Sequence, residues 1–364
     1  MNYYPLNAGS LSDLGDIYLL DDEYTNEFQP SIGEIDNSKL ALDFRYLEKG
    51  RINTYTLTSL ISYFSKISSN LGYPVPLILD WNPYILKFLE RIDFFKTISD
   101  FNIFWYDDRF LGGYGPYEFN PNTKIFGYSK LTANIEYNSD LLDESKERLR
   151  RYFEDDLGGK ISNLFSIKDS KIISDLDELI RTLSIVSAEL IVNSLIHGKS
   201  STFVGLQRSP RRISISICDS GLGFENTLPF SHPWINNLKL SGNSQYIGYA
   251  CFIKESGFGI KQAIEKILNI HGRIHISSNT NELVLKPRFW SNIKERFAKN
   301  KANNFKQDSL RIISNEFPSV PSQYRTTGYC RYFKSLYSQP NEPEKRINVE
   351  GTRISFEIPI NYKE

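Results

Sequence analysis

The sequence predicts a protein of the α/β (α+β) class with two α/β domains in one chain. The chain has 364 residues, of which 40% are hydrophobic, so it can bury two cores. Residues 39–107 alternate short apolar runs with stretches of helical periodicity, and residues 141–360 carry a second series of such segments. Between them, residues 108–140 are rich in Gly, Tyr, Asn and Pro, as in loops. We place the domain boundary there, with domains at 1–125 and 126–364.

The N-terminal part is expected to form a sheet with helices packed on it. Strands are expected in "KLALDFRYL" (39–47), "VPLILDW" (75–81) and "FNIFWYD" (101–107), and helices over 56–72 and 83–98. Gly72 suits the end of the first helix, and Pro83 suits the first turn of the second. The order of elements resembles STAS-like domains, small strand-helix modules found in bacterial switch proteins. This resemblance implies a STAS-like module over 1–125, with an acidic segment at its start.

Charge is balanced over the whole chain but uneven along it. The 43 basic and 43 acidic residues cancel, so no long-range attraction to nucleic acid or an anionic membrane is expected. Residues 1–50 carry ten acids and three bases, whereas residues 282–346 carry thirteen bases and six acids. The two regions can pair, or mark a surface for a partner, and two ordinary solvated faces also explain the pattern.

Cysteine content and apolar patterning indicate a cytoplasmic protein without a membrane span. Three scattered cysteines fit neither a disulfide framework nor a zinc site. The N-terminal residues lack the basic and apolar regions of a signal peptide. No window approaches roughly 18 uninterrupted apolar residues, the length that a membrane helix needs.

The segment "SAELIVNSLIHG" (187–198) places two polar side chains on one flank of an apolar helix. Glu189 and Asn193 are four residues apart, so they project from the same face. An amide oxygen suits a Mg²⁺ ion that keeps most of its waters. A carboxylate one turn away can orient or deprotonate a hydroxyl or a water. Taken alone, such a pair more often lies on a solvated helix face. His197 is interpreted as a residue that caps the helix C-terminus beside Gly198.

Two glycine-containing segments follow. The alternating strand that begins at Arg212 runs into "DSGLG", where Asp219 can accept a hydrogen bond from an exocyclic amino group. Gly221 and Gly223 let the backbone pass close to a planar base. Taken alone, this segment also fits a turn at the end of a strand.

The third and fourth segments lie further along the chain. In "GFGI", Gly257 and Gly259 precede a helix, whose first N–H groups can bind phosphate. Ordinary helix-start chemistry also explains such a segment. In "NVEGTRISFEIPI" (348–360), Thr352 enters the last strand.

These four segments resemble, in order, the motifs of the GHKL (Bergerat-fold, histidine-kinase-like) ATPases. "ELIVNSLIHG" matches the N-box, most like that of anti-sigma-factor serine kinases, and "DSGLG", "GFGI" and "GT" match the later boxes. The resemblance implies an α/β sandwich over 126–364 that binds ATP and Mg²⁺. The implied roles are general base or water-orienting carboxylate for Glu189, magnesium ligand for Asn193, adenine recognition for Asp219, contact with the base for Gly221 and Gly223, phosphate binding for Gly257 and Gly259, and support of the adenine side for Thr352.

Two further segments are placed by this resemblance. Residues 224–256 occupy the position of the ATP lid, and residues 286–346 form an insert that alternates basic and aromatic residues. A basic and aromatic surface of this kind can bind the acidic N-terminal segment, a partner protein or nucleic acid. Nucleic acid is the partner we least expect.

The histidines narrow the function. The four histidines, His197, His232, His271 and His275, all follow Glu189, so no phosphoacceptor histidine precedes the N-box. We therefore do not expect a complete self-phosphorylating histidine kinase. The expected function is Mg-ATP binding with hydrolysis or phosphoryl transfer, as an ATPase or a serine/threonine-type protein kinase in intracellular regulation. The alternative is a non-catalytic ATP-gated switch or scaffold. A protein partner or phosphoacceptor is expected, and a homodimer is left open.

Overall fold

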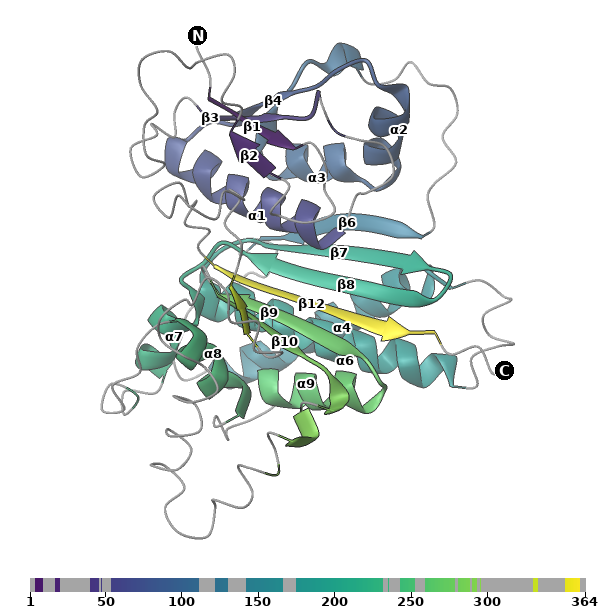
Figure 1. Ribbon diagram of the computed structural model, residues 1–364, viewed down its shortest axis with the longest axis vertical. Helices are drawn as coiled ribbons and strands as arrows, with labels where there is room; N and C mark the ends of the chain where they lie inside the picture. Colours follow the sequence, from purple (N-terminus) through teal and green to yellow (C-terminus); the bar gives the residue numbers. More distant parts are fainter. Residues whose placement is uncertain are drawn as a thin grey trace.

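The computed structural model confirms a mixed α/β protein built on two sheets (Figure 1). It describes residues 4–8, 17–19, 40–45, 47, 54–110, 122–129, 142–165, 175–231, 235, 243–252, 259–278, 281–288, 290–292, 295, 330–332 and 351–360.

The N-terminal sheet has five strands in the order β2-β1-β3-β4-β5. They are β1 (Tyr4–Ala8), β2 (Ile17–Leu19), β3 (Leu40–Asp43), β4 (Val75–Ile78) and β5 (Phe104–Trp105). The pairs β1–β3, β3–β4 and β4–β5 are parallel, and β2 joins β1 antiparallel. The helices of this part are α1 (Thr54–Leu71), α2 (Pro83–Arg91) and α3 (Phe94–Asp100), followed by a short 3₁₀ turn at Asp108–Phe110.

The helix predicted over 83–98 is two helices, so this prediction was wrong in its continuity. The chain turns at Asp93, which has φ 64°, a left-handed conformation that an aspartate tolerates better than most residues. Hydrophobic periodicity continues through the break, because Phe94 and Phe95 remain buried on the same core as Leu89. Asn82 accepts a hydrogen bond from the N–H of Ile85 and caps α2 at its start.

The second sheet has seven antiparallel strands in the order β11-β10-β9-β12-β8-β7-β6. They are β6 (Thr123–Tyr128), β7 (Thr202–Ser209), β8 (Arg212–Asp219), β9 (Arg273–Ser278), β10 (Asn281–Leu285), β11 (Cys330–Tyr332) and β12 (Thr352–Pro359). The boundary that we placed between residues 125 and 126 falls inside β6. Because β6 pairs with β7 along its whole length, the change from one sheet to the other comes before Thr123.

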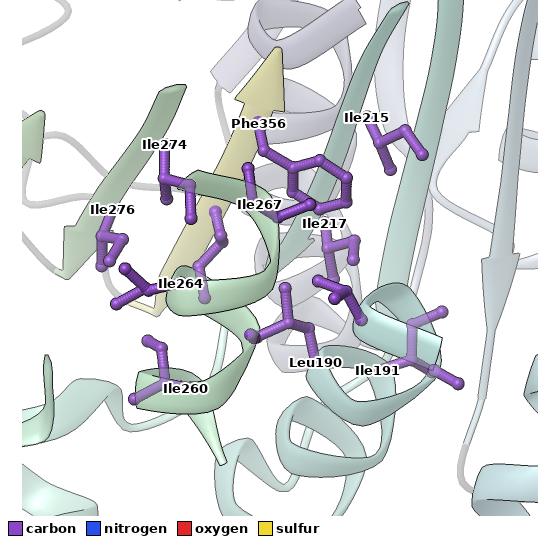
Figure 2. Packing of buried hydrophobic residues seen from close by; sticks show 14 of the residues in the cluster. Leu190, Ile191, Ile215, Ile217, Ile260, Ile264, Ile267, Ile274, Ile276 and Phe356 are labelled. Carbon is purple, nitrogen blue, oxygen red and sulfur yellow. The ribbon is translucent and has the colours of Figure 1, made fainter. Parts of the chain in front are cut away.

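One face of this sheet carries a layer of helices. They are α4 (Leu142–Ser162), α6 (Leu176–Asn193) and α9 (Ile260–Asn269), and α7 (Gly223–Ser231) and α8 (Asn243–Phe252) pack beside them. Figure 2 shows the core beneath the layer, where Leu190 of α6 and Ile264 of α9 face Ile217 and Phe356 of the sheet. The strict alternation of β8 turns Ile215 and Ile217 toward these helices.

Among the described residues, one helical stretch, Leu176–Gly198, is long and apolar enough to cross a membrane. It is weak evidence for a membrane span, because 67% of its apolar window is buried inside the fold. A core helix of this kind passes the same test.

The opposite face of the seven-stranded sheet is covered by α1 of the N-terminal part (Figure 1). The contact is made by small polar groups: Thr58 Oγ1 lies 3.0 Å from Ser216 Oγ on β8. Gly205 of β7 allows this approach, since a Cβ atom there would lie 2.9 Å from side-chain atoms of Thr54 and Thr58. The sheet is therefore sandwiched between α1 and the layer of α4, α6 and α9.

Candidate functional site

The helix α6 ends in a π-helical turn, Ser194–Gly198, instead of a regular α-helical turn. Such wide turns reorient the side chains that follow a helix and are frequent at functional sites. Here Asn193, Ser194, His197 and Gly198 all line one pocket. The apolar periodicity of α6 buries Leu190 and Ile191 under the sheet and leaves this end of the helix at the pocket.

The pocket lies between the end of α6, the helices α7, α8 and α9, and the ends of β8 and β12. The cavity volume is about 70 Å³. Its lining residues are Leu190, Asn193, Ser194, His197, Gly198, Asp219, Gly223, Phe224, Thr227, Leu228, Ala250, Ile260, Thr352 and Ile354. The fold thus brings four predicted site residues, Asn193, Asp219, Gly223 and Thr352, to the wall of one cavity.

Asp219 is a buried carboxylate with a strongly organised environment. Its side chain is held by the backbone N–H groups of Gly221 at 2.9 Å and Thr352 at 3.2 Å, both of which donate to Oδ1. The hydroxyl of Ser194 also donates to this carboxylate. Burial raises the pKa of Asp219 above its usual range, and these hydrogen bonds oppose the rise. The group is a hydrogen-bond acceptor in a largely apolar pocket.

Glycines allow three backbone segments to meet around Asp219. A Cβ atom on Gly221 would lie 2.1 Å from the carbonyl oxygen of Gly198, and one on Gly351 would lie 2.1 Å from the carbonyl oxygen of Asp219. Any other residue at either position would push the segments apart. Gly221 therefore holds the loop against α6 and does not itself line the pocket, unlike Gly223, whose φ of 72° starts α7.

The glycines expected to bind phosphate lie at the start of α9. Gly259 precedes the first residue of this helix, and space around it is open, since an added Cβ would meet nothing within 4 Å. Its neighbour Ile260 lines the pocket, so the N-terminus of α9 lies at the rim. Gly257 lies outside the described residues.

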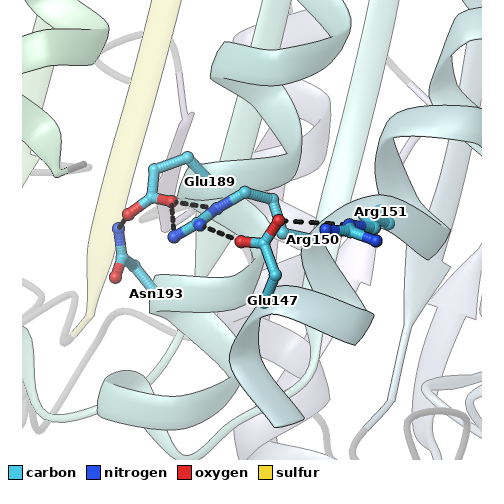
Figure 3. A network of polar contacts seen from close by, with 5 residues as sticks. All are labelled: Glu147, Arg150, Arg151, Glu189 and Asn193. Atoms are coloured by element: carbon cyan, nitrogen blue, oxygen red, sulfur yellow. Dashed lines mark hydrogen bonds and ion pairs between the residues drawn. The ribbon is translucent and has the colours of Figure 1, made fainter. Parts of the chain in front are cut away.

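Glu189 lies one turn before Asn193 and does not line the pocket. Its side chain is 3% exposed, and both carboxylate oxygens accept hydrogen bonds (Figure 3). Oε2 accepts from Nε and Nη2 of Arg150 on α4, at 2.8 and 2.7 Å. Oε1 accepts from Nδ2 of Asn193 at 2.9 Å. Glu189 is therefore linked to the pocket by its hydrogen bond to Asn193, which does line the pocket.

Several pocket residues were not singled out from the sequence as site residues. Ser194 and His197 reach the pocket because of the π-helical turn, and no local pattern predicts that turn. Phe224, Thr227 and Leu228 come from α7, in the segment 224–256 expected to be a lid; its described parts form α7, a short turn at Ile235, and α8. Most of the insert 286–346 lies outside the described residues; within it, Trp290 is buried and β11 extends the sheet.

The described residues contain no group of three or more His, Cys, Asp or Glu side chains that could hold a metal ion. Compared with protein-family models, curated proteins and solved structures, the chain matches none of them.

Proposed function

We propose that this pocket binds Mg-ATP. The observation that carries the proposal is the placement of Asp219: a buried carboxylate, with one oxygen held by two backbone N–H groups, in the wall of a largely apolar cavity. Such a group offers an acceptor to the exocyclic amino group of adenine, while Leu190, Leu228 and Ile354 supply apolar contacts for the base. The order of motifs shared with GHKL ATPases supports the same reading.

The phosphates would lie toward α9 and Asn193. The first N–H groups of α9 have no carbonyl partner within the helix, and the positive end of the helix dipole lies at the same end, and both favour a phosphate. Asn193 lines the pocket and can give Mg²⁺ a single amide oxygen, and phosphates and water complete the shell, as is usual for this ion.

The chemistry proposed is hydrolysis of ATP or transfer of its terminal phosphoryl group to a serine or threonine of a partner protein. Glu189 accepts a hydrogen bond from the proposed metal ligand Asn193 and is the candidate general base. Its carboxylate already accepts hydrogen bonds from Arg150 and from Asn193. We propose a cytoplasmic regulatory role, in which the STAS-like N-terminal module, docked through α1, connects the nucleotide to a partner.

A second function is favoured by one observation: both oxygens of the buried Glu189 carboxylate already accept hydrogen bonds. In this state the carboxylate is engaged by Arg150 and Asn193 and is buried away from attacking water. A protein held in this state would bind ATP without turning it over and would act as a nucleotide-gated switch or scaffold.

One experiment tests the proposal and separates the two forms. Purified protein is incubated with Mg²⁺ and γ-labelled ATP, and bound nucleotide, released phosphate and labelled candidate proteins are measured together. Binding with phosphate release or labelling supports an enzyme, and binding alone supports a switch. Absence of ATP binding at millimolar nucleotide would contradict both.

A further inference from the structure

The contact between Arg150 on α4 and Glu189 on α6 has a consequence for the metal. We propose that Arg150 is a positioning residue: through Glu189, it fixes the amide of Asn193 with its oxygen available to Mg²⁺. This inference rests on the proposed Mg-ATP function of the pocket. It assigns a role to α4, a helix that contributes no residue to the pocket wall.

The orientation of the Asn193 amide follows from the chemistry of its partner. An ionised carboxylate only accepts hydrogen bonds, so the amide must present its Nδ2 group to Glu189, as observed at 2.9 Å. Oδ1 then lies on the side away from Glu189, as Figure 3 shows. A rotated amide would present NH₂ to the cation, and nitrogen bearing two hydrogens cannot act as a ligand. Glu189 therefore selects the orientation that binds metal.

Arg150 in turn holds the Glu189 carboxylate in place. A carboxylate this deeply buried is costly to leave unpaired, and two N–H groups of the guanidinium meet the same oxygen at 2.7 and 2.8 Å. Because the guanidinium engages Oε2, Oε1 is the oxygen that meets the Asn193 amide. The ion pair therefore fixes the acceptor against which the amide is oriented.

Arg150 is itself held from the other side by α4. Its Nη1 donates to Glu147 Oε2 at 2.6 Å, so the guanidinium bridges Glu147 and Glu189. The neighbouring Arg151 donates to the other oxygen of Glu147 at 3.2 Å, and its side chain is 76% exposed. Arg151 shares the local charge network and points away from Glu189 in Figure 3, so it is a matched control.

The test measures ATP affinity with Mg²⁺ and with EDTA, and takes their ratio. In Arg150→Met, we expect the Mg²⁺-dependent gain in affinity to fall by about 10-fold or more, as for other residues that orient metal ligands, with metal-free affinity unchanged. Arg151→Met should keep the wild-type ratio. Arg150→Lys keeps the positive charge and loses the planar pair of N–H donors, so its ratio should lie between those of the wild type and Arg150→Met. A purely structural role for Arg150 would change stability or both affinities together, and not their ratio.

Because Arg150→Met leaves a buried carboxylate unpaired, it can unfold the chain. The double variant Arg150→Met/Glu189→Gln removes both charges and keeps a hydrogen-bonding side chain beside Asn193. Since glutamine can present either its oxygen or its nitrogen, the Mg²⁺-dependent gain should again be reduced. A wild-type ratio in a folded variant overturns the positioning role and leaves the Mg-ATP proposal intact. Lack of Mg²⁺-dependent ATP binding in the wild type overturns both.

Discussion

Oδ1 of Asp219 accepts a hydrogen bond from the backbone nitrogen of Thr352 at 3.2 Å, although 133 positions separate the two residues. The N–H of Gly221 donates to the same oxygen at 2.9 Å. The closing strand and the loop after β8 thus fix one end of the carboxylate. The proposed recognition of the base can therefore be tested by replacing one carboxylate oxygen of Asp219 with an NH₂ group.

Replacing Asp219 with asparagine should weaken ATP binding and change base preference. The amide oxygen would accept from Gly221 and Thr352, and the NH₂ group would then face the pocket. There it opposes the amino group of adenine and suits the carbonyl oxygen of guanine. We expect ATP affinity to fall by about 10- to 100-fold, which corresponds to roughly 1–3 kcal/mol, and the preference for ATP over GTP to narrow or reverse.

Competition between ATP and GTP measures this preference. Asp177→Asn, on the exposed first turn of α6, is a control that should leave it unchanged. Equal affinities for ATP and GTP in the wild type would mean that Asp219 only organises the turn after β8.

The raised pKa of Asp219 predicts opposite pH trends for the free protein and for ATP binding. Since the folded pKa lies above the unfolded value of about 3.9, the stability that this group contributes is fully present below the unfolded pKa and is lost as pH rises through the folded pKa. ATP affinity should increase over the same interval, because a protonated carboxyl would present a hydrogen-bond donor where the amino group of adenine needs an acceptor.

Thermal denaturation across this pH interval, with and without Mg-ATP, checks both trends. The shift in melting temperature caused by ATP should grow with pH. In Asp219→Asn, whose side chain cannot ionise, the part of this shift that depends on pH through residue 219 should disappear. A wild-type ATP shift that does not change across the interval would remove Asp219 as a titrating contact.

Asn193→Ala should weaken Mg-ATP binding and also lower stability. The substitution removes the proposed metal ligand and takes one donor from the buried Glu189 carboxylate. Leaving that oxygen without its partner should cost about 1–3 kcal/mol of unfolding free energy. Calorimetry and denaturant unfolding measure the two effects, with Ser184→Ala as a control on the same helix. Wild-type Mg-ATP affinity in Asn193→Ala would argue against the metal assignment.

Glu189→Ala separates an enzyme from a switch. At saturating Mg-ATP, loss of a general base should lower the rate of phosphate release by about 10²- to 10⁴-fold. A switch predicts negligible release by the wild type, with the variant altering only partner binding or the proteolysis of residues 224–256 when ATP is present. A variant that keeps the full wild-type rate would show that Glu189 is not the base.

The contact between α1 and the seven-stranded sheet is expected to be sensitive at Gly205. A methyl group there would lie 2.6 Å from Ser216 Oγ and 2.9 Å from atoms of Thr54 and Thr58. Gly205→Ala should therefore destabilise the protein by about 1–3 kcal/mol through overpacking. Gly159→Ala in α4 meets nothing within 4 Å and should be neutral, or stabilising by up to about 1 kcal/mol. Equal unfolding midpoints for the two variants would show that α1 is not held at this position.

Local structure was largely predictable from the sequence. The alternation that begins at Arg212 predicts a strand and the structure has β8 there; the pattern over 56–72 predicts a helix, and α1 spans Thr54–Leu71. The same helical spacing placed Glu189 next to Asn193, where the structure has a hydrogen bond. These features depend on residues within about four positions of each other, so the order of side chains along the chain is enough to set them.

Tertiary structure decided which residues the site contains and what each one touches. Nothing near Arg150 in the sequence indicates that it meets Glu189, and Arg353 in β12 is 1% exposed, with its guanidinium donating to Ser277 at 3.1 Å. No local pattern in the sequence predicts that α1 packs on the sheet through Thr58 and Ser216. Such contacts depend on which segments pack together, and that choice reflects the burial of apolar surface over the whole chain, a sum that no short pattern contains.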